Sequence, residues 1–278
     1  MGAGGQILVS NDAGATWTPE ESPTRLALLG VAVKGNVAIA VGQMGTIVVK
    51  AGDGDWELVE ADTQERLFAV DLNAKGVAIA VGGFGTLLRS NDAGAQWSKA
   101  APEWEGMFND PTGMLGFFEP SMYDVRVTDD GVVTIVGEVS LVLRSEDGGE
   151  TFTAVNAGGG SDEGIDPSLF AVEILPNGNG FAVGQEGFML QTNDAGKTWR
   201  GMSVQTTSNL LGVSSSPAGE VVIAGMRDAL FSVDNGQTWQ RINGVDIAIG
   251  WYSGTAWPVG AVGPLLVGNA ASILQIEK

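Results

Sequence analysis

Acidic side chains are the residues of this sequence that could do chemistry, because it contains 33 Asp and Glu residues but no His and no Cys. The absence of His and Cys removes the commonest general base, thiol chemistry and the usual transition-metal ligands. Glycoside hydrolysis needs only two carboxylates at a fixed separation, and Asp110, Glu119 and Asp124 are candidates near an insertion. A solvated acidic surface explains these three residues better than a catalytic pair does.

Other catalytic and metal-binding classes find little support. A sialidase would need an arginine triad, a Tyr–Glu nucleophile pair and usually an Arg-Ile-Pro segment. The chain has no such segment, and only Tyr123 and Tyr252 are available. Residues 158–166 offer oxygen ligands for calcium but lack EF-hand spacing, which favours a flexible loop. No P-loop or dinucleotide fingerprint precedes a helix. The sequence therefore predicts no catalytic residues, no metal and no cofactor.

The charge balance restricts the partners. The formal net charge is −19, with only 14 Lys and Arg residues. Nucleic-acid binding and docking on anionic lipid both need clusters of basic residues, so neither is expected. No apolar run reaches the ~18–20 residues of a membrane span.

One motif recurs along the chain and predicts the elements that carry these residues. Ser10–Trp17 reads SNDAGATW, and similar Asp boxes follow at a period of about forty residues, with two longer intervals between 97 and 199. A degenerate copy ends at Trp56. The Asp and the closing aromatic residue of the five intact copies are Asp12 and Trp17, Asp92 and Trp97, Asp147 and Phe152, Asp194 and Trp199, and Asp234 and Trp239.

Short alternating apolar segments fill each repeat, as in residues 28–35, 37–45 and 46–50, and Gly separates them. Four short strands in each repeat of about forty residues are typical of a β-propeller blade. We expect the Asp to fix a tight turn and the aromatic residue to bury a large face between sheets. The Asp boxes are therefore interpreted as folding devices within a single propeller domain over 1–278.

The two ends of the chain bear on the number of blades. Residues 1–7 align with 41–47, which places the start inside a blade, so the lack of a signal peptide says little about the compartment. Residues 266–274 align with the same stretch, so strands from both ends are expected to close the ring. Both ends offer a third strand, at 6–10 and 272–277, which favours seven blades over six.

The blade sequences AVGQMGTIVVK, AVGGFGTLLRSNDAGAQW, AVGQEGFMLQTNDAGKTW and AGMRDALFSVDNGQTW resemble the BNR/Asp-box propellers, and among them the photosystem II assembly and stability factor family with its bacterial relatives. The resemblance implies an exported, lumenal or periplasmic protein that helps a membrane complex to assemble. Relatives in non-photosynthetic bacteria are associated with RND-family exporters. The photosynthetic members carry an Arg-rich patch, whereas the Arg residues here are scattered, which favours the exporter-associated relatives. Asp boxes are specific for the fold and not for the function.

An insertion at about 101–121 is the most informative feature for function. It crowds Met and aromatic residues into one inter-blade connection, and such residues anchor protein interfaces. They can instead bury themselves against the blades. A second, Gly-rich and acidic insertion at about 156–168 is expected on the same face. The candidate docking residues of the first insertion are Trp104, Met107, Phe108, Met114, Phe117 and Phe118.

Two functions are therefore considered. The first is a non-catalytic, extracytoplasmic scaffold that binds a membrane protein complex, with an RND-type exporter expected and a photosystem II assembly factor-like role as the alternative. The second is a carbohydrate-active propeller, which would show paired carboxylates in one cleft beside aromatic platforms. The mouth of the central channel is the competing location for a small ligand.

Overall fold

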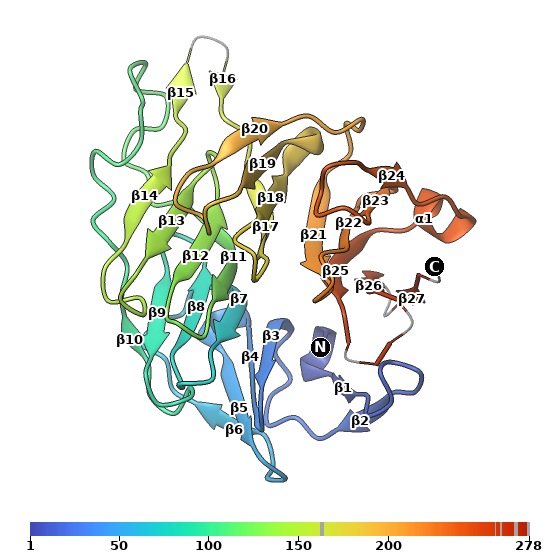
Figure 1. Cartoon of the computed structure of the whole chain (residues 1–278). Helices are drawn as coiled ribbons and strands as arrows, with labels where there is room; N and C mark the ends of the chain where they lie inside the picture. The colour runs from blue at the N-terminus through green and yellow to red at the C-terminus, as the bar shows by residue number, and fades with distance from the viewer. Residues whose placement is uncertain (162–163, 259, 262, 270–271, 277–278) are drawn as a thin grey trace. The chain divides into compact units, whose positions relative to one another are not determined.

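The chain forms two compact units, each built of short antiparallel strands joined by tight turns (Figure 1). The computed structural model describes residues 1–161, 164–258, 260–261, 263–269 and 272–276. Unit 1 comprises Met1–Val9 and Thr18–Asp166, and unit 2 comprises Ser10–Trp17 and Pro167–Lys278. Within these ranges no helix is both long enough and apolar enough to cross a bilayer.

Unit 1 contains three four-stranded sheets whose strands follow one another in sequence order. The first has β3 (Leu28–Lys34), β4 (Val37–Gly42), β5 (Ile47–Ala51) and β6 (Glu57–Val59); the second has β7 (Leu67–Leu72), β8 (Ala78–Gly82), β9 (Leu87–Ser90) and β10 (Ser98–Lys99); the third has β11 (Met122–Val127), β12 (Val133–Gly137), β13 (Val142–Ser145) and β14 (Thr153–Asn156). Smaller elements are η1 (Ala3–Gly5), β1 (Ile7–Val9), β2 (Thr18–Glu20), η2 (Gln43–Gly45), β15 (Gly160–Ser161) and β16 (Gly164–Ile165).

Unit 2 repeats the same arrangement in two four-stranded sheets and one three-stranded sheet. The first has β17 (Leu169–Ile174), β18 (Gly180–Gly184), β19 (Met189–Thr192) and β20 (Arg200–Met202), with η3 (Gln185–Gly187); the second has β21 (Leu210–Ser215), β22 (Val221–Gly225), β23 (Ala229–Ser232) and β24 (Gln240–Arg241); the third has β25 (Tyr252–Ala256), β26 (Leu265–Gly268) and β27 (Ile273–Gln275). A short helix, α1 (Val245–Ile249), precedes the third sheet.

The described residues form six blade sheets, five with four strands and one with three, so the prediction of seven blades is wrong. The reason lies in the two end segments. β1 pairs with β2, and together they supply no inner strands of a blade. The predicted last strand, 272–277, is observed as β27, which pairs with β26, while Glu277 lies outside the described residues. The first and last strands therefore belong to different sheets, and the expected closure by shared strands is not seen in this pairing.

The core lies mainly along the second strand of each four-stranded sheet. β8 and β18 are buried at every residue, and Ile79 and Phe181 have no exposed surface. Continuous apolar runs of this kind fill the space between adjacent sheets, because both faces of the strand are covered. In unit 1 the second sheet packs against both the first and the third, with side chains from each in shared clusters.

The Asp boxes fasten the turn between the third and fourth strands. Asp194 Oδ1 accepts a hydrogen bond from the backbone N–H of Thr198 at 2.9 Å, and Oδ2 accepts one from the Thr198 hydroxyl at 2.6 Å. Thr192 Oγ1 donates to Asp194 and accepts from Gly196 N–H at 3.0 Å. These bonds, above all the one from the Thr198 hydroxyl, lower the pKa of Asp194 to about 2. The other intact copies, at Asp12, Asp92, Asp147 and Asp234, form the same turn.

The Trp residues that close the Asp boxes are less buried than the sequence predicts. Trp97 and Trp199 are half-buried, and Trp17 is 37% exposed. Each of these indole N–H groups donates to the carbonyl of the Gly in its own turn, as Trp199 does to Gly196 at 3.1 Å. The ring thus covers its own turn and only partly reaches the space between two sheets.

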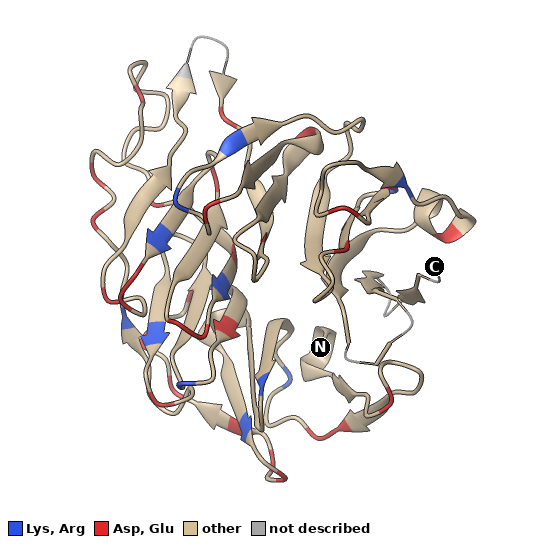
Figure 2. Ribbon diagram, in the orientation of Figure 1, with Lys and Arg blue, Asp and Glu red and all other residues tan. Residues whose placement is uncertain are grey.

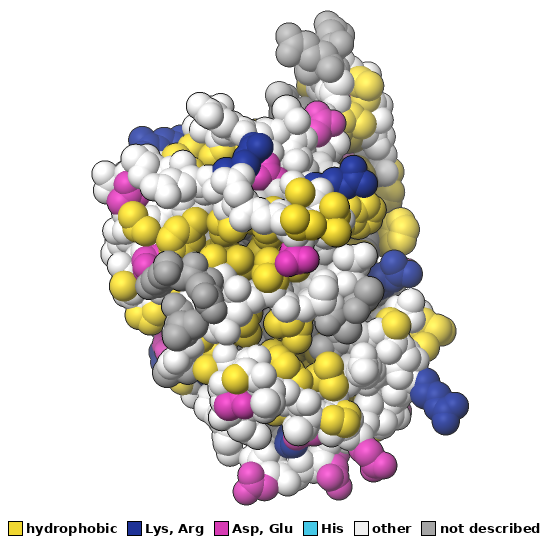
Figure 3. All heavy atoms as spheres, turned by 90° about the vertical axis from the view of Figure 1, so that its right-hand side faces the viewer, with side chains coloured by type: hydrophobic (Ala, Val, Ile, Leu, Met, Phe, Trp, Pro, Cys, Tyr) yellow, Lys and Arg dark blue, Asp and Glu magenta, His cyan; other side chains and the backbone are white. Residues whose placement is uncertain are grey.

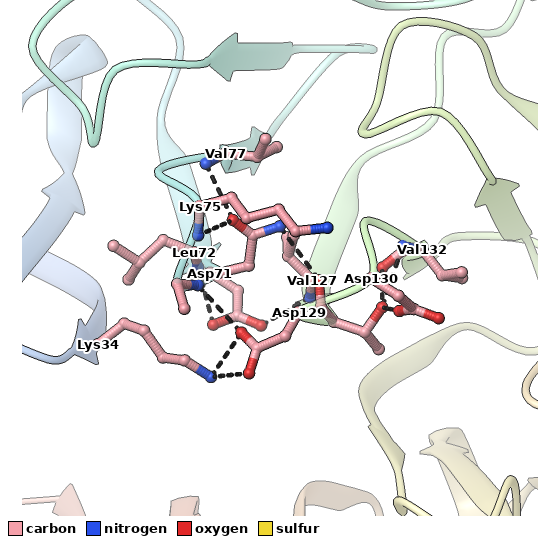
Figure 4. A network of polar contacts seen from close by, with 12 residues as sticks. Lys34, Asp71, Leu72, Lys75, Val77, Val127, Asp129, Asp130 and Val132 are labelled. Atoms are coloured by element: carbon pink, nitrogen blue, oxygen red, sulfur yellow. Dashed lines mark hydrogen bonds and ion pairs between the residues drawn. The ribbon is translucent and has the colours of Figure 1, made fainter.

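A polar network connects the first strands of the three large sheets in unit 1 (Figure 4). Asp71 on β7 accepts the N–H of Val127 on β11 at 2.7 Å and that of Leu72 at 2.9 Å. Lys34 at the end of β3 forms an ion pair with Asp129 at 2.9 Å. Burial raises the pKa of Asp71 to about 6, although the Arg126 charge and the two N–H donors act in the opposite direction.

The raised pKa of Asp71 predicts a pH dependence of stability. Between pH 4 and pH 6 the folded protein holds a proton on Asp71 that the unfolded chain has released, so stability should fall as the pH rises through this window. The steepest contribution is about 1.4 kcal/mol per pH unit, the slope of one proton. Urea denaturation at several pH values should show this fall in the wild type and not in Asp71→Asn. Parallel profiles for the two proteins would contradict the assignment.

Candidate functional site

The insertion at 101–121 connects β10 to β11 in unit 1 and is anchored at both ends. Trp104 is only 9% exposed and packs in the apolar cluster that joins the second and third sheets. Near the other end, the Pro120 carbonyl accepts the N–H of Gly85 at 3.0 Å. A Cβ at Gly85 would approach Trp104 Nε1 to 2.5 Å, so a glycine lets the loop lie directly on the β8–β9 turn. The loop is therefore attached to the sheets and not free along its length.

A turn at Asp110 shapes the middle of the insertion. Its carboxylate accepts the N–H of Met114 at 3.0 Å and the N–H of Leu115 at 2.8 Å, and also the Thr112 hydroxyl at 3.2 Å. Partial desolvation acts to raise the pKa of Asp110, but these hydrogen bonds outweigh it and lower the pKa. An ionised carboxylate that caps its own loop holds the following residues in a fixed conformation.

The two insertions touch each other. The N–H of Asn109 donates to the Gly158 carbonyl at 3.2 Å, and Asn109 forms a parallel bridge with Gly159. Asp166 closes the second insertion by accepting the N–H of Gly159 at 2.9 Å. In Figure 1 the 101–121 loop rises beside the β15–β16 hairpin. The apolar insertion and the acidic one therefore form one continuous surface on unit 1.

Large apolar side chains are exposed on this surface beside acidic ones. Phe117 is 89% exposed and Met114 is 55% exposed. Phe84, at the adjacent β8–β9 turn, is 71% exposed. A pocket of about 380 Å³ opens within the loop, and its lining residues are Trp104, Glu105, Gly106, Phe108, Asp110, Leu115, Gly116, Phe117 and Phe118. We name Phe84, Met114 and Phe117, together with this pocket, the loop surface.

The six predicted docking residues divide into three groups. Trp104 is buried in the core cluster, which contradicts a role as an exposed anchor. Met107, Phe108 and Phe118 are half-buried, and the Phe108 and Phe118 rings meet edge to face at 5.3 Å. Met114 and Phe117 are exposed. The loop thus has an apolar interior of its own that supports two exposed side chains.

Phe84 was missed by reasoning from the sequence. It occupies the tip of the β8–β9 turn with φ +50°, and Met44 occupies the same place in the β4–β5 turn with φ +53°. The available signal was a large apolar residue between two glycines, where most turns carry polar residues. Phe84 and Met44 are exposed at these tips, at 71% and 58%, whereas Val139 at the equivalent tip of the β12–β13 turn is only 3% exposed.

Two of the three carboxylates considered for glycoside hydrolysis are engaged in local contacts. Asp110 caps its loop, and its lowered pKa is the opposite of what a general acid requires. Asp124 forms an ion pair with Arg126 at 3.1 Å. Glu119 is exposed on the loop. These contacts give the candidate carboxylates structural and surface roles.

The 158–166 run, considered for calcium, is only partly described. Asp162 and Glu163, two of the oxygen ligands in the 158–166 run, lie outside the described residues. Among the residues that are described, no three His, Cys, Asp or Glu side chains are grouped so that they could hold a metal ion. Asp166 instead binds the backbone of its own loop, through Gly159.

A comparison with protein families identifies a likeness in the segment that includes part of the loop surface. Residues 117–213 match the family model of the photosynthesis system II assembly factor YCF48. The match covers about a third of the chain and begins at Phe117. No curated protein sequence matches the chain.

Solved structures show the fold. A structure described as YCF48 bound to D1 peptide superposes with a TM-score of 0.71 at 19% identity, covering 100% of this chain and 88% of that one. YCF48 from Cyanidioschyzon merolae gives 0.55 at 16% identity, covering 95% and 99%. The GH74 xyloglucanase from Xanthomonas campestris gives 0.65 at 16% identity, covering 88% of this chain but 44% of the enzyme.

The fold is therefore an all-β propeller of the BNR type that resembles the photosystem II assembly factor. The xyloglucanase shares this architecture at an identity that carries no argument about activity. Neither comparison supports the expected RND-type exporter as a partner. The family-model match agrees better with the alternative, a photosystem II assembly factor-like protein, while the solved structures show the fold alone.

Proposed function

We propose that this chain is a non-catalytic assembly factor that binds a peptide segment of a membrane protein through the loop surface. The observation that carries the proposal is the exposure of Phe117 and Met114 on a loop that is itself packed and hydrogen-bonded. A fixed loop presents its anchors without a large ordering cost on binding. Support also comes from a similar propeller whose structure is described as bound to a D1 peptide.

The chemistry of the surface suggests what the bound segment is like. Residues 101–121 contain Glu103, Glu105, Asp110 and Glu119 but no Lys or Arg. Acidic side chains are also distributed along these loops in Figure 2. Complementary charge steers association and selects partners. We therefore propose a segment with apolar side chains for the pocket and Lys or Arg residues beside them. An extracytoplasmic location is proposed on the family resemblance alone.

The test is affinity capture from detergent-solubilised membranes of the source cells. The double substitution Met114→Ser and Phe117→Ser should lower recovery of a specific membrane protein at least tenfold, since a few apolar anchors carry most interface energy. Its melting temperature should stay close to that of the wild type, because exposed residues contribute little to folding. Peptides tiled across the captured protein should then bind the wild type directly.

A matched control lies on unit 2. Val245 and Ile249 of α1 are 76% and 71% exposed. α1 lies at the right of Figure 1, the side that Figure 3 presents, where hydrophobic and acidic side chains are both visible. Val245→Ser with Ile249→Ser should leave capture unchanged. Equal capture by the wild type and both double variants would reject the loop surface as the binding site.

A further inference from the structure

Methionine is the only sulfur-containing residue of this chain, which has eight Met residues and no Cys. All eight lie within the described residues, and they differ in exposure. Met122 and Met189 have no exposed surface, whereas Met44 is 58% exposed and Met114 is 55% exposed. The remaining four are half-buried, namely Met1, Met107, Met202 and Met226. Two methionine side chains are therefore open to a reagent in solvent.

Met114 combines a fixed backbone with an uncovered side chain. Its N–H donates to Asp110 Oδ1 at 3.0 Å, and the N–H of Leu115 donates to Asp110 Oδ2 at 2.8 Å. A Cβ at Gly160 would approach the Cβ of Met114 to 3.2 Å, so the second insertion lies against the base of this side chain. A chemical change at the far end of the side chain therefore alters the loop surface without releasing the turn.

Oxidation is the chemical change that a methionine side chain undergoes most readily. One molecule of hydrogen peroxide transfers an oxygen atom to the thioether sulfur, which gives the sulfoxide and one molecule of water. The sulfoxide is polar, so covering it with an apolar side chain of a partner carries a desolvation cost that the thioether lacks. Hydrogen peroxide is small and uncharged, so the acidic side chains of residues 101–121 do not repel it.

We propose that Met114 is a reversible oxidation site that controls binding at the loop surface. A peroxide converts Met114 to the sulfoxide and weakens partner capture, and methionine sulfoxide reductases restore the thioether and with it the capture. The second exposed anchor, Phe117, contains no sulfur, so Met114 is the anchor on which a peroxide acts. The proposal rests on the proposed function, because it concerns regulation of that same surface.

Met44 provides an internal control. It occupies the β4–β5 turn of the first sheet, and its exposure is nearly equal to that of Met114. It does not belong to the loop surface, since it lines a separate groove with Leu58 and Trp97. Both methionines should therefore react with peroxide at similar rates, while only the oxidation of Met114 should affect capture.

The first measurement is the rate of oxidation at each methionine. The whole chain is treated with dilute hydrogen peroxide, the reaction is stopped with catalase, and peptide mass spectrometry measures the sulfoxide. Met44 and Met114 should react about tenfold faster than Met122 and Met189, because burial excludes the oxidant. Equal rates at Met114 and Met122 would overturn the proposal.

The second measurement is capture from detergent-solubilised membranes, with the oxidised and the untreated chain as bait. Oxidation of the wild type should lower recovery about tenfold, as the loss of one apolar anchor does. Met114→Leu should capture the same protein before and after peroxide, because leucine is apolar and has no sulfur. Met44→Leu should lose capture on oxidation as the wild type does. Methionine sulfoxide reductases specific for the two sulfoxide epimers should together restore recovery in the oxidised wild type.

The outcomes distinguish this proposal from the function on which it rests. No capture by the untreated wild type would reject the proposed function, and the control of capture with it. Capture that survives complete oxidation of Met114, or that peroxide abolishes equally in Met114→Leu, would overturn the oxidation site alone. A clear fall in the melting temperature of the oxidised wild type would also overturn it. The loss of capture would then follow from damage to packed residues such as Met107, which lies against the core cluster.

Discussion

Replacing Gly236 by alanine should destabilise the protein more than any other Gly→Ala change in an Asp box. Gly236 has φ +77°, and a Cβ there would lie 2.1 Å from the ring of Phe181. Phe181 is fully buried on β18, and Trp239 packs against it edge to face at 5.5 Å, so the ring has little room to move. Overpacking costs about 1–3 kcal/mol. A left-handed backbone adds about 1–2 kcal/mol for a residue with a Cβ.

Two other glycines separate these causes. Gly35 has φ +60° with open space around its Cβ position, so Gly35→Ala should show the backbone cost alone. Gly201 on β20 has neither a positive φ nor a close neighbour, so Gly201→Ala should be almost neutral. Urea denaturation should show the largest loss of stability for Gly236→Ala, a smaller one for Gly35→Ala and the smallest for Gly201→Ala. A loss at Gly236 no larger than at Gly35 would show that Phe181 yields to the added methyl group.

This ranking also shows what the Asp-box sequence could and could not predict. The motif predicted a tight turn and a carboxylate that holds it, because those interactions are local to eight residues. It did not predict that the Gly must also lie against the neighbouring sheet, as Gly94 does against Ile39. The burial of the Trp rings between sheets was overestimated for the same reason. It depends on the neighbouring sheet and not on the motif.

The predicted number of seven blades was wrong because an alignment of repeats identifies strands but does not show which strands pair. Residues 6–10 and 272–277 both match a third strand, and both form one, as β1 and β27. A complete sheet also needs inner strands, and those of β1 are not supplied by the described residues. Likewise, the composition of residues 101–121 indicated an apolar loop but not which side chains face inward. That division depends on Gly85 and on the cluster between two sheets, both far away in the sequence.

The interior of the loop surface leads to the prediction with the largest expected loss. Trp104→Ala should lower the free energy of unfolding by about 3–5 kcal/mol, because truncating a buried Trp removes its packing and leaves a cavity. Trp104 is 9% exposed and lies in a cluster with Leu87, Met122 and Leu141, so its loss affects two sheets. Urea denaturation followed by tryptophan fluorescence and far-UV circular dichroism measures the change in the free energy of unfolding.

Phe117→Ala is the matched control, because Phe117 lies on the same loop and is 89% exposed. It should change stability by no more than about 0.5 kcal/mol, as surface substitutions do. The effects on partner capture should be reversed. Phe117→Ala should weaken capture directly. Any loss of capture in Trp104→Ala should come from its unfolded fraction and should disappear at low temperature. A Trp104→Ala loss below about 1 kcal/mol, well under the range for a buried aromatic, would mean that the loop is not fastened to the core. The fixed presentation of Met114 and Phe117, on which the proposed function depends, would then have no support.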